Sequence, residues 1–269
     1  MAMTEIAYLG PAGTFSHLVA ERRFGKGAKL IALPTILDVF AFVSRHPSRR
    51  GIVPIENSSG GAIYETVDIL LENRPPVKID EEISLQVRLA LLGRTGESIK
   101  VLFSHFAPME HCATWLRRHL SRVERRVVAS TATAARMAFL ENNSAALGSR
   151  NLAKLYHLDI LHYPVEADIA NETSFLVISG HTKDLQRANR TTIGAITPNV
   201  PGGLCSFLET FRDHGVNLCR LLSRPIRGCP REYAFLVDIE GGIRVEKVQA
   251  ALKAARQACV HLRIIGSYP

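Results

Sequence analysis

Short apolar strands alternate with amphipathic helices through the first 180 residues, and this order restricts the possible folds more than any other feature. Apolar runs at 6–9, 30–33 and 51–57 alternate with helical patterns at 16–24 and 36–43. Repeated strand–helix units are typical of α/β proteins, in which helices cover a largely parallel sheet. The sequence therefore predicts an α/β domain over residues 1–180.

The alternation is interrupted after Pro75 and Pro76, where longer strands at 78–92 follow with no helix between them. Strand–helix alternation then resumes. We expect two lobes, one of about 1–76 plus 167–180 and the other of 77–166, with the chain crossing between them near residues 76 and 167. This arrangement is periplasmic-binding-protein-like, and a cleft between two lobes is a common place for a small ligand.

The last 80 residues have a different order. Residues 181–190 are polar and lack apolar periodicity, so they are predicted to be a linker. Residues 191–269 then read as strand, helix, strand, strand, helix, strand. That is the split βαβ pattern of ferredoxin-like domains.

Composition excludes several other classes of protein. The N-terminus lacks a secretory signal and no apolar run reaches a membrane span, so we expect a cytoplasmic protein that does not bind membranes. Five scattered cysteines include no C-x-x-C pair, and ten histidines include no H-E-x-x-H, so we expect no metal. The net charge is +8, but the basic stretch 117–126 lacks aromatic residues for base stacking. We therefore expect no nucleic acid; a positive field would help to capture a dicarboxylate.

Four loops share one design, in which a strand ends, small polar residues follow, and a helix begins. Helix N-termini with nearby hydroxyl groups can bind a carboxylate, although serine and threonine also cap helices routinely. The candidate side chains are Thr14, Ser16, Asn57, Ser58, Ser59, Ser104, His105, Ser130 and Thr131. Neither a dinucleotide fingerprint, nor a P-loop, nor a G-x-S-x-G elbow is present.

These loops resemble the ordered motifs of a known family. The matching segments are Gly10 to Ser16, Pro54 to Ser58, Ser104-His105, Ser130 to Ala132, and Asn171-x-Thr173-x-Phe175. Together they resemble the prephenate dehydratases. The C-terminal unit, with Pro201-Gly202-Gly203-Leu204, Asn217-Leu218, Ser223-Arg224-Pro225 and the terminal Gly266 to Pro269, is similar to the ACT domain of that family.

The resemblance implies a carbon–oxygen lyase of phenylalanine biosynthesis that converts prephenate into phenylpyruvate by loss of water and carbon dioxide, without a cofactor. It implies that Thr173 is the catalytic residue, and that Asn171 and Phe175 join the loop residues in binding substrate. Since a threonine hydroxyl is a weak acid, we expect Thr173 to donate a hydrogen bond to the departing hydroxyl. An ordinary strand threonine is the alternative interpretation.

The resemblance also implies regulation by phenylalanine at an interface between two ACT domains, in a homodimer or homotetramer. Expected effector-binding residues are Gly202, Gly203, Leu204, Asn217, Leu218, Leu222, Ser223 and Arg224. The glycines would allow close approach of the ligand to the main chain.

Several positions depart from the family pattern. Ser174 stands where the family has arginine, and further departures are Phe106, Ala107, His111, Ala129 and Leu222. Two alternatives therefore stay open: a diverged enzyme that acts on prephenate or a similar cyclic acid with altered chemistry, and a non-catalytic ligand-binding sensor. The sequence leaves the choice between prephenate and arogenate open as well.

Overall fold

The computed structural model describes residues 3–165, 170–180 and 188–269, and within them the chain forms two compact units. One unit contains residues 1–35, 56–61 and 84–175, and the other contains 36–55, 62–83 and 176–269. The strands β3 (Arg50–Asn57), β5 (Lys78–Gln86) and β11 (Glu172–Ser179) each contribute residues to both units. The predicted crossing at 167 and residues 181–187 of the predicted linker lie outside the described residues.

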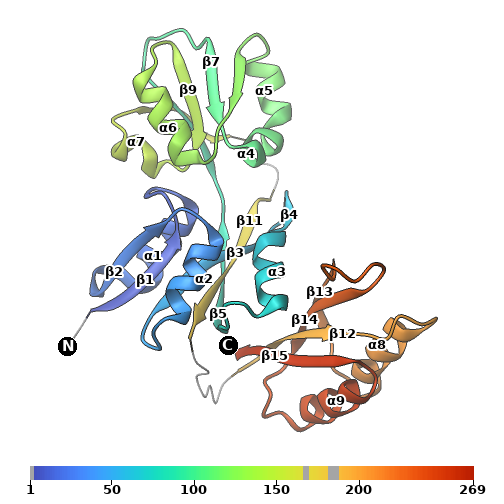
Figure 1. Ribbon diagram of the computed structural model, residues 1–269. Coiled ribbons are helices and arrows are strands. Elements are labelled where there is room, and N and C mark those ends of the chain that lie inside the picture. The colour runs from blue at the N-terminus through green and yellow to red at the C-terminus, as the bar shows by residue number, and fades with distance from the viewer. Residues whose placement is uncertain (1–2, 166–169, 181–187) are drawn as a thin grey trace. The chain divides into compact units, whose positions relative to one another are not determined.

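The first unit opens with a parallel strand pair and one capped helix (Figure 1). β1 (Thr4–Leu9) pairs with β2 (Ala28–Leu33), joined by α1 (Phe15–Phe24) and the short 3-10 helix η1 (Gly25–Gly27). The Thr14 side chain accepts a hydrogen bond from His17 N, which caps α1, and Gly25 ends the helix with φ 60°.

The rest of the first unit is built on a five-stranded sheet with the order β10-β6-β9-β7-β8. Its strands are β6 (Leu89–Gly93), β7 (Val101–Ser104), β8 (Glu124–Val127), β9 (Ser144–Gly148) and β10 (Asp159–Val165). The helices are α4 (Phe106–His111), α5 (Ala113–His119), α6 (Thr131–Leu140) and α7 (Asn151–Leu155).

The central strands of this sheet are apolar on both sides, and helices cover both of its faces. Ala90 and Leu92 pack in the same core cluster as Ala134 and Ala135 of α6. Their neighbours in β6 belong to the opposite core cluster, which contains Leu116 of α5. Successive residues of a strand point to opposite faces, which explains why the sequence here reads as continuous apolar runs.

The second unit contains a sheet with the order β13-β14-β12-β15-β5-β11-β3. Its C-terminal part has the predicted order of elements. These are β12 (Arg190–Ile196), α8 (Gly203–Asp213), β13 (Leu218–Pro225), β14 (Tyr233–Glu240), α9 (Glu246–Gln257) and β15 (His261–Tyr268). The unit also contains α2 (Ile36–Ser44) and α3 (Tyr64–Glu72), while β4 (Gly61–Ala62) lies at the boundary of the two units. The predicted α/β class and the C-terminal βαββαβ domain are confirmed.

The two C-terminal helices cover one face of their sheet (Figure 1). Phe207 and Phe211 of α8 pack in one core cluster with Ile193 and Val237 of β12 and β14. Thr192 and Asp238 alternate with these residues along the same strands and are also buried. The face opposite the helices therefore carries buried polar groups.

Two elements predicted from the sequence were wrong in detail, and one strand was missed. The sequence pattern predicts a single helix at 109–120, but α4 begins at Phe106 and ends before Cys112, whose φ of −89° and ψ of 11° interrupt the helix. Pro108 lies in the first turn of α4, where a helix does not need the N–H that proline lacks. The sequence also predicts a strand at 126–129, but the strand there is β8, which is exposed and begins at Glu124. No strand was predicted at β10, where Pro164 weakens the pattern.

No helix in the described parts of the chain is long and apolar enough to cross a membrane.

Candidate active site

The carboxamide of Asn57 joins two segments of the first unit that are far apart in the sequence. Asn57 is the last residue of β3, and its Nδ2 donates to Asn171 Oδ1 and to Thr173 Oγ1, both at 2.8 Å. Its Oδ1 accepts from the backbone N–H groups of Ser59 and Gly60, both at 2.9 Å. Two backbone donors on one side fix the orientation of the amide, so the NH₂ group faces Thr173.

This orientation matters for the chemistry of Thr173. A hydroxyl group has one hydrogen to donate and two lone pairs that accept. Because Asn57 supplies the hydrogen in the bond between the two side chains, Thr173 keeps its own hydrogen for another acceptor. Thr173 is half-buried in β11, so the hydroxyl is held in place and is not enclosed.

Ser58 strengthens the same connection. Its backbone N–H donates to Glu172 O at 2.8 Å, and its Oγ accepts from Glu172 N at 2.9 Å and donates to Ala170 O at 3.3 Å. The loop after β3 is therefore bonded to residues 170–173 at the start of β11. The predicted residues Asn57, Ser58, Asn171 and Thr173 lie together in one cluster.

Ser59 connects this cluster to the helix α4. Its Oγ lies 2.9 Å from His111 Nδ1, the last residue of that helix. His111 is one of the departures from the family pattern. Its imidazole is bonded to Ser59, which lies two residues after Asn57 in the loop. The cluster therefore extends through Ser59 to a side chain of α4.

The other predicted hydroxyl groups serve mainly as helix caps or lie in the interior. Thr14 caps α1 and donates to Leu9 O at 3.1 Å. Ser130 caps α6, accepting from Thr133 N at 3.0 Å. Ser16, Ser104 and Thr131 are buried. Phe175 is also buried, at 2% exposure, so its ring packs within the protein.

His105 is the N-cap of α4. Its Nδ1 accepts from Ala107 N at 3.4 Å, an arrangement that requires an unprotonated Nδ1. Burial lowers the pKa of His105 below its ordinary value. The cap and the burial thus both favour the neutral imidazole.

The lowered pKa of His105 predicts a pH-dependent contribution to stability. Between the folded-state pKa and the unfolded value of about 6.5, the unfolded chain binds more protons, so stability rises with pH. We expect His105→Asn, which keeps a capping side chain but does not titrate, to lose this contribution. The measurement is the free energy of unfolding of both proteins between pH 5 and 7.5, and a difference that does not vary with pH would contradict the prediction.

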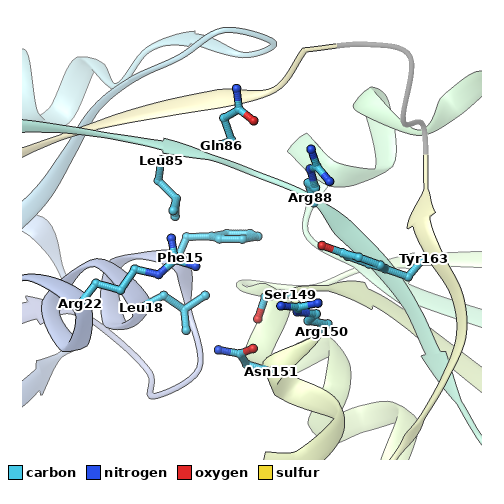
Figure 2. A pocket seen from close by; sticks show the side chains of 10 residues that line it. All are labelled: Phe15, Leu18, Arg22, Leu85, Gln86, Arg88, Ser149, Arg150, Asn151 and Tyr163. Carbon is cyan, nitrogen blue, oxygen red and sulfur yellow. The ribbon is translucent and has the colours of Figure 1, made fainter. Parts of the chain in front are cut away.

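A pocket in the first unit contains residues that the sequence did not single out (Figure 2). Its volume is about 170 Å³. The lining residues are Phe15, Leu18, Arg22, Leu85, Gln86, Arg88, Ser149, Arg150, Asn151 and Tyr163. Three of them lie on one face of α1, at the spacing i, i+3 and i+7, which was the one signal in the sequence that could have revealed them.

The pocket adjoins the Thr173 cluster. Val87, between Gln86 and Arg88, donates its backbone N–H to Asn171 O at 2.7 Å. On another side, Ser149 Oγ lies 3.5 Å from the carbonyl oxygen of Gly13, in the loop that precedes α1. The segment that lines the pocket therefore runs beside the segment that carries Thr173.

Comparison with known proteins shows in which family this arrangement of residues occurs. The prephenate dehydratase family model matches residues 6–183. A bifunctional chorismate mutase/prephenate dehydratase from Aquifex aeolicus is 36% identical over 267 residues, which cover 98% of this chain and 73% of the relative. The chain belongs to the prephenate dehydratase family. Its members are carbon–oxygen lyases that act on prephenate, and the predicted family and enzyme class are confirmed.

Solved structures support the same assignment. The structure of a prephenate dehydratase from Arthrobacter aurescens in complex with L-Phe matches with a TM-score of 0.87 and 27% identity, covering 98% of this chain and 89% of that one. A structure described as GqqA, a novel type of quorum quenching acylase, matches equally well, with a TM-score of 0.87 and 26% identity over 98% and 97% of the two chains.

The predicted effector residues of this prephenate dehydratase all lie in the second unit. Gly202 precedes α8 with a positive φ of 81°, and a Cβ on Gly203 would lie 2.3 Å from Pro198 O, so both positions favour glycine. Leu204 and Leu218 pack against the C-terminal core, and Asn217 Nδ2 donates to Glu240 Oε1 at 3.2 Å. Leu222 is half-buried and Ser223 is exposed on β13.

Arg224 has a different role. Its guanidinium makes a two-pronged ion pair with Asp68 of α3 and lies 4.5 Å from the centre of the Tyr64 ring. These contacts join the C-terminal domain to a helix that precedes it by about 150 residues. Arg224 is thus positioned to hold the two parts together within the second unit.

Among the residues that the structure describes, no group of three or more His, Cys, Asp or Glu side chains could hold a metal ion.

Proposed function

We propose that the protein converts prephenate into phenylpyruvate and that Thr173 donates a hydrogen bond to the departing ring hydroxyl. The observation that carries this proposal is the hydrogen bond from Asn57 to Thr173, which leaves the Thr173 hydrogen available. Prephenate takes up one proton and yields phenylpyruvate, carbon dioxide and water. The bond from the ring to its carboxylate breaks, its electrons make the ring aromatic, and the C4 hydroxyl leaves as water.

The protein has to hold the substrate and stabilise charge on the departing oxygen. A fixed donor aimed at that oxygen is the usual way to do so, and each such donor accounts for a rate factor of about 10² to 10³. Asn57 also bonds to Ser59, Gly60 and Asn171, and these bonds fix its amide. The amide in turn donates to Thr173 and holds its hydroxyl group in place.

The decisive experiment is to incubate the purified protein with prephenate and to follow phenylpyruvate and carbon dioxide separately. We expect both to form in equal amounts. Carbon dioxide without phenylpyruvate would indicate the altered chemistry of a diverged enzyme, and binding without turnover would indicate a sensor. Arogenate in place of prephenate tests the amino-acid form of the substrate, and a parallel acylase assay tests the activity described for the structural neighbour.

We further propose that phenylalanine regulates the enzyme by binding between ACT domains of a homodimer or homotetramer, in the cytoplasm. The L-Phe complex of the Arthrobacter aurescens relative supports this assignment. Two backbone positions at the start of α8 favour glycine, which suits close approach by the ammonium and carboxylate groups of an amino acid. Leu222 replaces a charged residue of the family pattern, so we expect weaker coupling between effector and active site.

Asn217 provides the test of the regulatory site, because any residue with a Cβ would be strained at the positive φ of Gly202. We expect Asn217→Ala to raise the dissociation constant of phenylalanine by about tenfold, the effect of losing one good hydrogen bond to a charged group. Calorimetric titration measures this, with Asn189→Ala, just before β12, as the matched control. Equal affinity in wild type and Asn217→Ala would remove Asn217 from the site.

A further inference from the structure

The pocket in Figure 2 is rich in cations. Arg22, Arg88 and Arg150 are among its ten lining residues, and none of the ten is acidic. In the described parts of the chain, no carboxylate forms an ion pair with any of the three arginines. The positive charge of the pocket is therefore not neutralised by a carboxylate in the described parts of the chain.

The rest of the lining is divided between apolar and polar groups. Phe15, Leu18 and Leu85 form an apolar part, and Ser149, Asn151 and Tyr163 add hydrogen-bonding groups. Guanidinium groups are well suited to carboxylates, which they can bind through two parallel hydrogen bonds. Such a lining fits a carboxylate attached to an apolar body.

Arg22 and Arg150 are the best-placed of the three cations. In Figure 2 the Arg22 side chain extends from α1 toward Phe15 and Leu85, whereas Arg88 leaves its strand on the opposite side from Leu85. The guanidinium of Arg150 lies 5.5 Å from the centre of the Tyr163 ring, which fixes its position through a cation–π contact. Arg22 and Arg150 thus approach the pocket from different elements, α1 and the residue before α7.

The pocket is too small to enclose a whole drug-sized ligand. Its volume of about 170 Å³ lies below the range of about 300 to 1,000 Å³ that is typical for such ligands. It is large enough for a carboxylate with the few atoms next to it. One lining segment is bonded to Asn171 through Val87, so the Thr173 cluster is the nearest candidate to receive the remainder of the ligand.

The chemistry of the reaction decides which carboxylate of prephenate belongs here. The ring carboxylate loses its charge as carbon dioxide departs, while the side-chain carboxylate stays charged throughout. A guanidinium on the ring carboxylate would stabilise the substrate more than the transition state and would slow the reaction. A guanidinium on the side-chain carboxylate binds both states equally.

We propose that Arg22 and Arg150 bind the side-chain carboxylate of the substrate in this pocket, and that the ring carboxylate lies outside it. This inference rests on the proposed function. It makes the arginines substrate-binding residues that leave the chemical step unchanged. Phenylpyruvate retains the side-chain carboxylate, so the pocket should bind the product by the same contacts.

The experiment compares substrate and product in Arg22→Ala and Arg150→Ala. We expect each variant to raise the KM for prephenate and the inhibition constant of phenylpyruvate by the same factor, about tenfold, with kcat within about twofold of wild type. Arg23→Ala and Lys154→Ala, which remove exposed cations beside the two positions, are the matched controls and should change neither constant. Circular dichroism establishes that all variants are folded.

Two outcomes would overturn the inference. A higher KM with an unchanged inhibition constant for phenylpyruvate would place the ring carboxylate at the arginines. No change in either constant would show that the pocket does not bind the substrate. If the wild-type protein does not turn over prephenate, the proposed function fails instead, and calorimetric titration of phenylpyruvate into wild type and variants still tests the pocket.

Discussion

Thr173→Ala should lower kcat for prephenate by about 10² to 10³ while the dissociation constant of the substrate changes little. Removing one fixed donor to a charge that develops in the transition state has effects of this size. The ground state loses little, because the C4 hydroxyl of bound prephenate is neutral until the carbon–oxygen bond breaks. A fall in kcat without a matching change in affinity is the mark of an interaction made in the transition state.

Single-turnover kinetics and equilibrium binding of prephenate measure the two effects separately. Thr173→Ser is the matched control, since it keeps a hydroxyl group that can accept from Asn57. We expect the serine variant to retain most of the activity. If Thr173→Ala keeps more than about a tenth of the wild-type kcat, a loss below about 1.4 kcal/mol, Thr173 does not act on the departing oxygen.

Much of the architecture could be predicted from the sequence, because strand and helix periodicities are local properties. The alternation in the first 180 residues and the six elements of the C-terminal domain are examples. The predictions that were wrong concern local exceptions, such as a proline inside the first turn of α4 and an exposed edge strand at β8. In both cases the residues of a short segment favoured one local structure, and its neighbours in the fold imposed another.

The candidate site could be predicted in part only. The ordered motifs named Asn57, Asn171 and Thr173, but the direction of the Asn57 amide depends on backbone groups of the folded loop. Thr14 and Ser130 were named by a pattern that suits both anion binding and helix capping, and both cap a helix. Arg22 and Arg150 meet at the pocket through tertiary structure alone, since no local pattern connects α1 to the residue before α7.

A buried cluster of charges could not be predicted from the sequence either. Arg220 of β13 pairs with Asp238 of β14 and, at 2.7 Å, with Glu82 of β5. Arg190 also pairs with Glu82, at 2.6 Å, and Thr192 Oγ1 donates to Asp238 at 2.6 Å. The two carboxylates and two guanidiniums balance in formal charge. The cluster joins the C-terminal domain to β5, the strand that continues to Leu85 in the pocket.

Arg220 is the centre of this cluster. Burial alone would raise the pKa of Glu82, but the hydrogen bonds and charges of Arg220 and Arg190 hold that pKa below its ordinary value. Asp238 is completely buried, and burial raises its pKa despite the neighbouring Arg220. Asp238 is therefore the carboxylate that depends most on its cation.

Arg220→Ala should lower the free energy of unfolding by about 3 to 5 kcal/mol, the usual cost of leaving a buried charge without its partner. The side chain of Arg220 is only 10% exposed, so solvent would not replace the lost cation. Arg212→Ala is the matched control, because the Arg212 pair with Glu209 is exposed and should change the free energy of unfolding little. Denaturant unfolding, followed by circular dichroism, measures both variants.

The pH dependence of the same variant separates a charge effect from a packing effect. Without Arg220 the folded-state pKa of Asp238 should rise further above its unfolded value. A carboxyl group with a raised pKa weakens the fold as pH increases through that pKa, because the folded state then has to lose a proton that it holds more tightly than the unfolded chain does. The stability difference between wild type and Arg220→Ala should therefore be larger at pH 8 than at pH 5. A loss of stability that is the same at both values would show that Arg220 acts through packing of its side chain, and the cluster would not stabilise the junction electrostatically.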